Sequence, residues 1–120
     1  MSAPADVVIV GAGPAGCAAA IGATRRGLRA VVLDKATFPR DKTCGDGLTT
    51  AALRILEDLG LSRADLDTLG ATPVPETVIT APSGREIVLP MPTTGAHALV
   101  VERRRLDARL VDAARSAGAE

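Results

Sequence analysis

The sequence predicts an α/β fold built on a parallel β-sheet. Two short apolar runs, residues 6–10 and 30–33, have the composition of strands that are buried on both faces of such a sheet. Between them a glycine-rich turn, residues 11–16, leads into an alanine-rich helix that ends at Gly27. A strand, a helical crossover and a second strand in this order indicate that the two strands run parallel.

The first helix begins at Pro14, because proline suits the first turn of a helix, and it ends near Arg25 and Arg26. Residues 35–48 follow the second strand, and their charges and glycines predict a loop with a function. Two more helices are expected next. Thr49 or Thr50 can cap the first, which ends at Gly60, and Ser62 can cap a shorter one through Leu69.

A β-hairpin excursion is predicted within residues 72–95. Its two strands, 76–81 and 85–89, flank a Pro-Ser-Gly turn, after a linker at 72–75 and before a break at 90–95. A strand over 96–101 and an amphipathic helix over 103–117 complete the pattern.

We interpret residues 1–120 as one α/β domain that is incomplete at its C-terminal end. A helix in such a fold returns to a further parallel strand, but only three residues follow the last predicted helix. We therefore expect an N-terminal part of a longer protein, and a finished small domain is the alternative.

Composition excludes several classes of function. Fourteen basic and fourteen acidic residues cancel, which argues against a nucleic-acid partner, and the one aromatic residue, Phe38, excludes a base-stacking surface. Cys17, Cys44 and His97 have no zinc-site spacing, and two distant cysteines form no disulfide scaffold, so a cytoplasmic setting is expected. Residues 7–24 carry no charge, but their glycines and proline argue against a membrane span.

The turn carries the pattern Gly11-x-Gly13-x-x-Gly16, and Asp34 ends the next strand. Such glycines allow a tight turn, the approach of a pyrophosphate and close packing of helix on strand, while the helix N-terminus attracts phosphate. Asp34 can bind ribose hydroxyls and would repel a 2′-phosphate, which argues against NADP. This Rossmann-like fingerprint does not separate FAD from NAD. The alternative to cofactor binding is that the glycines serve only the turn and the packing of the helix.

Three segments carry a resemblance to a known family: residues 6–16, residues 38–47 with their Arg-x-Lys-x-Cys-Gly block, and the Arg-x-x-Leu-Asp-x-x-Leu motif that begins at Arg103. The sequence resembles flavoprotein reductases and monooxygenases of the p-hydroxybenzoate hydroxylase type, and within that group it is most similar to the geranylgeranyl reductase family. Residues 60–95 match no motif of these proteins.

The resemblance implies an extended FAD across the domain. Its ribose would meet Asp34, although many relatives carry the longer Glu there. Arg40 would lie near the flavin end and Arg103 near the ribityl or phosphate part, where both could neutralise the pyrophosphate. Exposed surface charges are the alternative for both arginines.

Cys44 is the candidate catalytic residue, facing the isoalloxazine or the substrate, with a pKa lowered by the flanking Lys42 and the flanking glycine turn at residues 45–47. A loop residue without chemistry is the alternative, and Cys17 and His97 are interpreted as structural. The predicted cofactor site comprises Gly11, Ala12, Gly13, Pro14, Ala15, Gly16, Asp34, Lys35, Arg40, Cys44, Gly45, Asp46, Gly47 and Arg103.

The predicted function is the FAD-binding part of a flavin-dependent oxidoreductase, with NAD(P)H as an expected electron donor. The family implies a reductase that acts on double bonds of a small hydrophobic, isoprenoid substrate, with peripheral membrane contact through other parts of the protein. A flavin-dependent aromatic monooxygenase and a non-catalytic dinucleotide-binding module are the alternatives. No protein partner is evident, and these residues alone are expected to be inactive.

Overall fold

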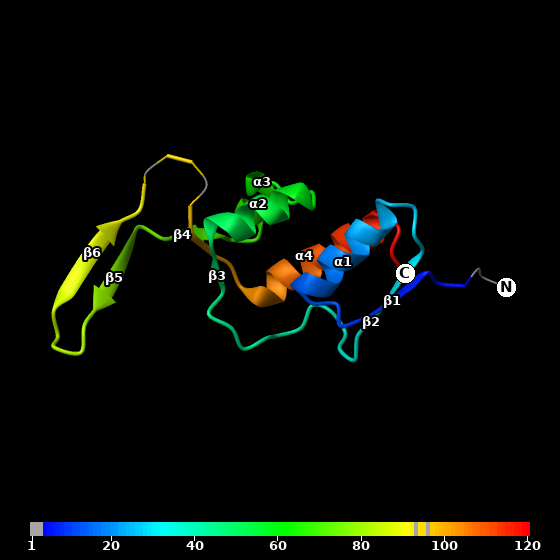
Figure 1. The fold of residues 1–120 in the computed structure, drawn as a ribbon, viewed down its shortest axis with the longest axis horizontal. Helices are drawn as coiled ribbons and strands as arrows, with labels where there is room; N and C mark the ends of the chain where they lie inside the picture. Colours follow the sequence, from blue (N-terminus) through cyan, green and yellow to red (C-terminus); the bar gives the residue numbers. More distant parts are fainter. Residues whose placement is uncertain (1–3, 93, 96) are drawn as a thin grey trace.

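The computed structural model describes residues 4–92, 94–95 and 97–120. Its parallel sheet consists of β1 (Val7–Val10) and β2 (Ala30–Leu33), in register from Val7 opposite Ala30 to Val10 opposite Leu33. The crossover is α1 (Pro14–Thr24), with Gly13 as its N-cap and Pro14 at its first position. The predicted strand–turn–helix–strand unit is therefore present (Figure 1).

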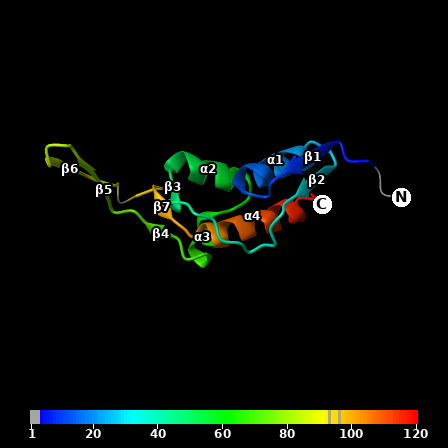
Figure 2. The same cartoon turned by 90° about the horizontal axis from the view of Figure 1, so that it is seen from below.

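The main core lies where α1 packs on α4 (Arg103–Ser116), and the two helices lie side by side in both views (Figures 1 and 2). On α1 the buried side chains are Cys17, Ala20 and Ile21. On α4 they include Leu106 and Leu110, which lie on the apolar face that the sequence predicted.

Two capped helices follow the loop, as predicted. In α2 (Thr50–Asp58) the Thr49 hydroxyl accepts a hydrogen bond from the backbone N–H of Ala52 at 3.2 Å. In α3 (Arg63–Thr68) Ser62 and Asp65 form a reciprocal capping box.

A three-stranded antiparallel sheet was only partly predicted. It orders β3 (Gly47–Leu48), β7 (Leu99–Val100) and β4 (Thr72–Pro73), with β7 in the middle. The interpretation of Gly47–Leu48 as loop and of Thr72–Pro73 as linker was wrong, because two-residue strands carry no hydrophobic period. The strand predicted over 96–101 is shorter than expected, and Ala96 lies outside the described residues, as does Thr93 in the predicted break.

The predicted hairpin is formed by β5 (Glu76–Thr80) and β6 (Glu86–Pro90), paired from Glu76 opposite Pro90 to Thr80 opposite Glu86. It projects away from the helices at one end of the molecule (Figure 1). All of its residues are exposed. The molecule is consequently elongated, with extents of 64 × 28 × 22 Å.

The last residue turns back onto the parallel sheet. The backbone N–H of Glu120 donates to Ala30 O at 3.0 Å, and the N–H of Val32 donates to Glu120 O at 2.7 Å. This parallel pairing uses the edge of β2 away from β1. The residue that ends this sequence thus pairs with β2 shortly after α4, although the sequence pattern predicted no strand there.

None of the helices in the described parts of the chain is long and apolar enough to cross a membrane. The uncharged run at residues 7–24 is divided between β1 and α1.

Candidate cofactor site

The glycine turn needs Gly11 and Gly16 for its own geometry. Gly11 has φ +106°, which disfavours any residue with a side chain. A Cβ at Gly16 would lie 1.8 Å from the carbonyl oxygen of Gly11 and 3.4 Å from Cγ2 of Ile9. Gly16 is therefore what lets α1 sit against the end of β1.

At Gly13 the geometry of the turn does not itself require glycine. A Cβ there would meet only Nη2 of Arg40, at an ordinary contact distance of 3.6 Å. The α1 N-terminus has no side-chain cap and no acidic residue in its first turn. Ala15 and Gly16 precede the first intrahelical donor, Cys17, so their N–H groups are available to a ligand. A free helix N-terminus beside a guanidinium is a site for an anion.

Asp34 is tied to this turn. Its carboxylate accepts hydrogen bonds from the backbone N–H of Ala12 at 2.7 Å and of Ala36 at 2.8 Å. These two bonds hold the pKa of Asp34 below its usual range. The carboxylate is exposed and has further lone pairs, so it can still accept from ribose hydroxyls. Neighbouring Lys35 is exposed and contributes positive charge.

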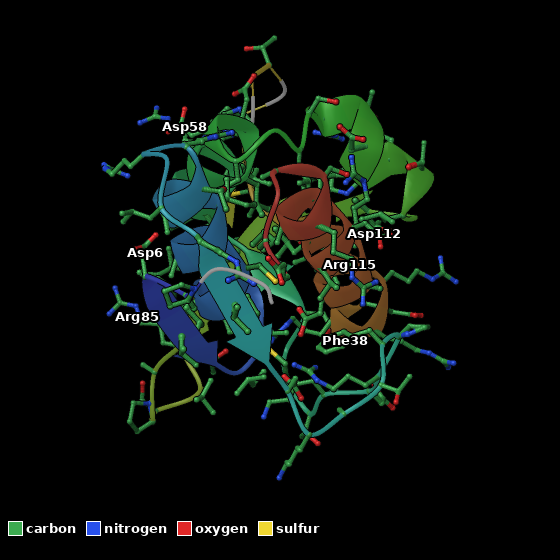
Figure 3. All side chains as sticks on the ribbon, turned by 90° about the vertical axis from the view of Figure 1, so that its right-hand side faces the viewer. Asp6, Phe38, Asp58, Arg85, Asp112 and Arg115 are labelled. Atoms are coloured by element: carbon green, nitrogen blue, oxygen red, sulfur yellow. The ribbon has the colours of Figure 1, made fainter. Side chains whose placement is uncertain are left out.

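A cavity of about 330 Å³ opens beside Asp34 and Ala12. The C-terminal half of α4 supplies Val111 and Ala114, and Phe38 lines it from the loop. Figure 3 looks onto this end of the molecule and labels Phe38 and Arg115, both of which line the cavity.

Arg40 and Arg103 meet at the buried carboxylate of Asp107, which was not among the predicted site residues. Asp107 on α4 is completely buried, and its Oδ1 and Oδ2 accept from Nε and Nη2 of Arg103 at 2.7 and 3.0 Å. Nη1 of Arg40 lies 2.9 Å from Asp107 Oδ2. Arg103 and Asp107 are four residues apart on a predicted helix, and that spacing was the signal for their pairing.

Neither arginine is a free surface charge. The side chains of Arg40 and Arg103 are 18% and 19% exposed. The guanidinium of Arg40 also lies over the ring of Phe38, 4.8 Å from its centroid. Its Nη1 is buried and makes no well-aligned hydrogen bond to protein.

The segment 44–47 packs against the start of α4. Asp46 has φ +55°; its Oδ1 accepts from the backbone N–H of Arg103 at 3.2 Å and its carbonyl from that of Val101 at 2.9 Å. A Cβ would meet nothing within 4 Å at Gly45 and only Gly45 O, at 3.9 Å, at Gly47. The folded chain alone therefore does not require glycine at either position.

Cys44 is exposed, and its thiol pKa lies below its ordinary value. The main cause of this lowered pKa is the backbone N–H of Asp46, which lies in the glycine turn predicted at residues 45–47, and the second is the Arg103 guanidinium. Lys42 is not among the causes. Cys17 is buried and its Sγ lies 3.3 Å from the carbonyl oxygen of Ala12, in agreement with a structural role. The His97 ring contacts the carbonyl oxygen of Thr94.

A second cavity, of about 320 Å³, lies between α1, α2 and α4 and has mostly apolar walls. The predicted site residues that line it come from the glycine turn, the loop and α4: Pro14, Ala15, Cys44, Gly47 and Arg103. The glycine turn thus contributes Ala12 to one cavity and Pro14 to the other, with Gly13 and Arg40 at the anion site.

A βαβ unit, a glycine turn at a free helix N-terminus and an acid at the end of the second strand define a dinucleotide-binding α/β domain. Residues 4–120 match the protein family described as FAD binding domain. The chain belongs to this FAD-binding family.

Similar proteins include reductases. Over 59 residues the chain is 63% identical to menaquinone reductase of Mycobacterium tuberculosis, covering 49% of this chain and 14% of the relative. Over 116 residues it is 38% identical to digeranylgeranylglycerophospholipid reductase 2 of Methanopyrus kandleri, covering 96% of this chain and 27% of the relative. The aligned segments thus cover about a seventh of the menaquinone reductase and about a quarter of the phospholipid reductase, so the chain matches only part of the length of these relatives.

Among solved structures, the flavin-dependent brominase Bmp2 superposes with a TM-score of 0.82 at 33% identity, covering 97% of this chain and 28% of the brominase. A geranylgeranyl bacteriochlorophyll reductase-like protein of Thermoplasma acidophilum gives 0.74 at 29% identity, covering 97% of this chain and 29% of that protein. These neighbours share the Rossmann-like fold with different named activities.

The residues present fit FAD. The space in front of Gly13, the Nη2 of Arg40 beside it and the free N-terminus of α1 suit a diphosphate. Asp34 lies where the adjoining cavity can receive a ribose. The apolar cavity beside Cys44 offers a surface for an uncharged ring.

Proposed function

We propose that this chain is the FAD-binding part of a flavin-dependent reductase that saturates double bonds of an isoprenoid substrate. The observation that carries this proposal is its similarity to reductases along the whole chain: 63% identity to menaquinone reductase over 59 residues and 38% identity to a digeranylgeranylglycerophospholipid reductase over 116 residues. Both names denote substrates that carry isoprenoid chains.

The roles of the chain's own residues follow from the site. The free N-terminus of α1 and Arg40 bind the cofactor diphosphate, and Asp34 binds a ribose. Cys44 and Arg103 line the apolar cavity, where they orient the ring or the substrate and exclude water. Bound FAD supplies hydride transfer, and NAD(P)H is the electron donor that we propose for it.

The test uses the natural full-length protein, purified and reduced anaerobically with NADPH or with dithionite. We expect bound FAD, reoxidation of the reduced flavin by a geranylgeranyl lipid without oxygen, and a product that has gained two hydrogens per reduced double bond. A protein that binds NAD but no FAD would contradict the cofactor assignment. A reduced flavin that no isoprenoid lipid reoxidises would contradict the substrate class.

A second candidate is an oxygen-dependent flavoenzyme, a halogenase or an aromatic monooxygenase. The superposition on the brominase, at 33% identity, favours it specifically. In that case the reduced flavin is reoxidised only when oxygen is present. The product is then brominated when bromide is supplied, or hydroxylated when an aromatic substrate is supplied. A non-catalytic module would bind flavin without turnover under either condition.

A further inference from the structure

Asp107 is the one charged side chain that is completely buried among the residues that the structure describes. A buried carboxylate is costly unless it is paired, and here two guanidiniums from different parts of the chain surround it. Arg103 belongs to the same helix, whereas Arg40 comes from the loop after β2. The carboxylate therefore joins that loop to α4.

The two arginines are held unequally. Arg103 makes two hydrogen bonds to Asp107, through Nε and Nη2, which is the strong forked geometry. Arg40 approaches one oxygen through Nη1, without good alignment, while its Nη2 lies beside Gly13. Arg40 thus contacts the carboxylate on one side and the anion site on the other.

We propose that Asp107 is a positioning residue for the cofactor diphosphate, because it fixes Arg40 beside Gly13 before the cofactor binds. The proposal rests on FAD binding by this family and is independent of the reductase activity. A cation held in place by a buried partner loses little conformational freedom when the ligand arrives, and this raises affinity.

The sign of the effect separates this role from simple electrostatics. Asp107 is negative and lies close to a site for an anion, so a purely electrostatic effect predicts that its neutralisation tightens FAD binding. A positioning role predicts the opposite, because the guanidinium of Arg40 then loses its fixed place.

The experiment titrates FAD into the apo form of the natural full-length protein and follows quenching of flavin fluorescence at several salt concentrations. Asp107→Asn keeps the shape and removes the charge. Asp107→Glu keeps the charge and moves it by one methylene. We expect both to weaken FAD binding at least tenfold, with a steeper salt dependence for Asp107→Asn. Asp112→Asn, an exposed acid of the same helix, is the matched control and is expected to change affinity less than twofold.

A second arm tests whether Asp107 acts through Arg40. In an Arg40→Met background, Asp107→Glu is expected to cost less than threefold in affinity, because the guanidinium that it positions is gone. Thermal unfolding of each apo variant identifies any variant that does not fold. If Asp107→Asn does not fold, the comparison uses Asp107→Glu in the wild-type and in the Arg40→Met background. Wild-type or tighter binding by the folded Asp107 variants would overturn the proposal, as would undiminished loss in the Arg40→Met background. A wild-type protein without FAD affinity would instead refute the cofactor.

Discussion

Gly13 and Gly16 belong to one turn but are needed for different reasons. At Gly16 the chain itself leaves no room, since a Cβ would lie 1.8 Å from Gly11 O. At Gly13 the nearest atom is the movable end of Arg40, at 3.6 Å. The fold itself therefore requires glycine at position 16, whereas the folded chain alone does not require it at position 13.

We therefore expect opposite results from two alanine substitutions. Gly16→Ala should destabilise the natural full-length protein by about 3 kcal/mol or more, because backbone must move to admit the methyl group. Gly13→Ala should change stability by less than about 1 kcal/mol but weaken FAD binding. Thermal unfolding and flavin titration measure the two effects, and equal loss of stability in both variants would contradict this assignment.

The two cysteines are expected to differ in reactivity. Cys44 is exposed with a lowered pKa, whereas burial raises the pKa of Cys17 to about 11. In native protein iodoacetamide should label Cys44 alone, with half-maximal rate below the pH of about 8.5 that is typical of free thiols. Arg103→Met should move this midpoint upward. Labelling of Cys17 without denaturant would show that its burial is misassigned.

At the scale of elements, Asp34 joins the end of β2 to the glycine turn and to the following loop. The backbone bonds from Ala12 and Ala36 favour its charged form in the folded state, so its folded-state pKa is depressed. This stabilisation is fully present above the unfolded pKa of about 3.9 and is lost as the pH falls through the lower, folded-state value.

Asp34→Asn should consequently lower the Tm at neutral pH, because it replaces the acceptor of two charge-assisted bonds. The difference in Tm between wild type and variant should shrink as the pH falls below about 3.9. Asp58→Asn, which removes an exposed acid elsewhere, serves as control. A difference that is independent of pH would mean that the charge of Asp34 does not stabilise the fold.

Elements with local signals were predictable from the sequence. The first βαβ unit, the capped α2 and α3, the hairpin and α4 each have a period or a cap that adjacent residues define. Strands β3 and β4 were missed, because two residues show no period and their partner β7 lies far along the chain. For the site, motif spacing predicted the glycine turn and Asp34, and the family resemblance implied both arginines. The convergence of Arg40 and Arg103 on Asp107 was not predictable, because it depends on tertiary packing.

The whole molecule is less compact than a typical globular domain of the same length. Its radius of gyration is 17.2 Å, against about 14 Å for a compact domain of 120 residues. Apolar side chains are open to solvent on the strands, where Val10 is 86% and Ile87 55% exposed. The matched relatives and structures are several times longer than this chain.

Expressed alone, residues 1–120 should therefore be poorly soluble or loosely packed. We expect binding of a hydrophobic dye and a broad thermal transition, because exposed strand edges and apolar side chains favour association. Replacing the exposed Ile79 and Ile87 by Thr should reduce aggregation without raising the Tm. A sharp cooperative transition of the unmodified chain, with dispersed NMR signals, would contradict this expectation.

The sheet of β3, β7 and β4 also implies an order of events during folding. The hairpin of β5 and β6 closes between neighbours in sequence, which takes microseconds, whereas β7 must find partners at residues 47–48 and 72–73. Contacts between distant segments form slowly, because chain entropy is lost before they are made. The β3–β7 pairing flanks Asp46 and Arg103, so the part of the cofactor site around Cys44 is expected to be among the last regions of a newly made chain to become ordered.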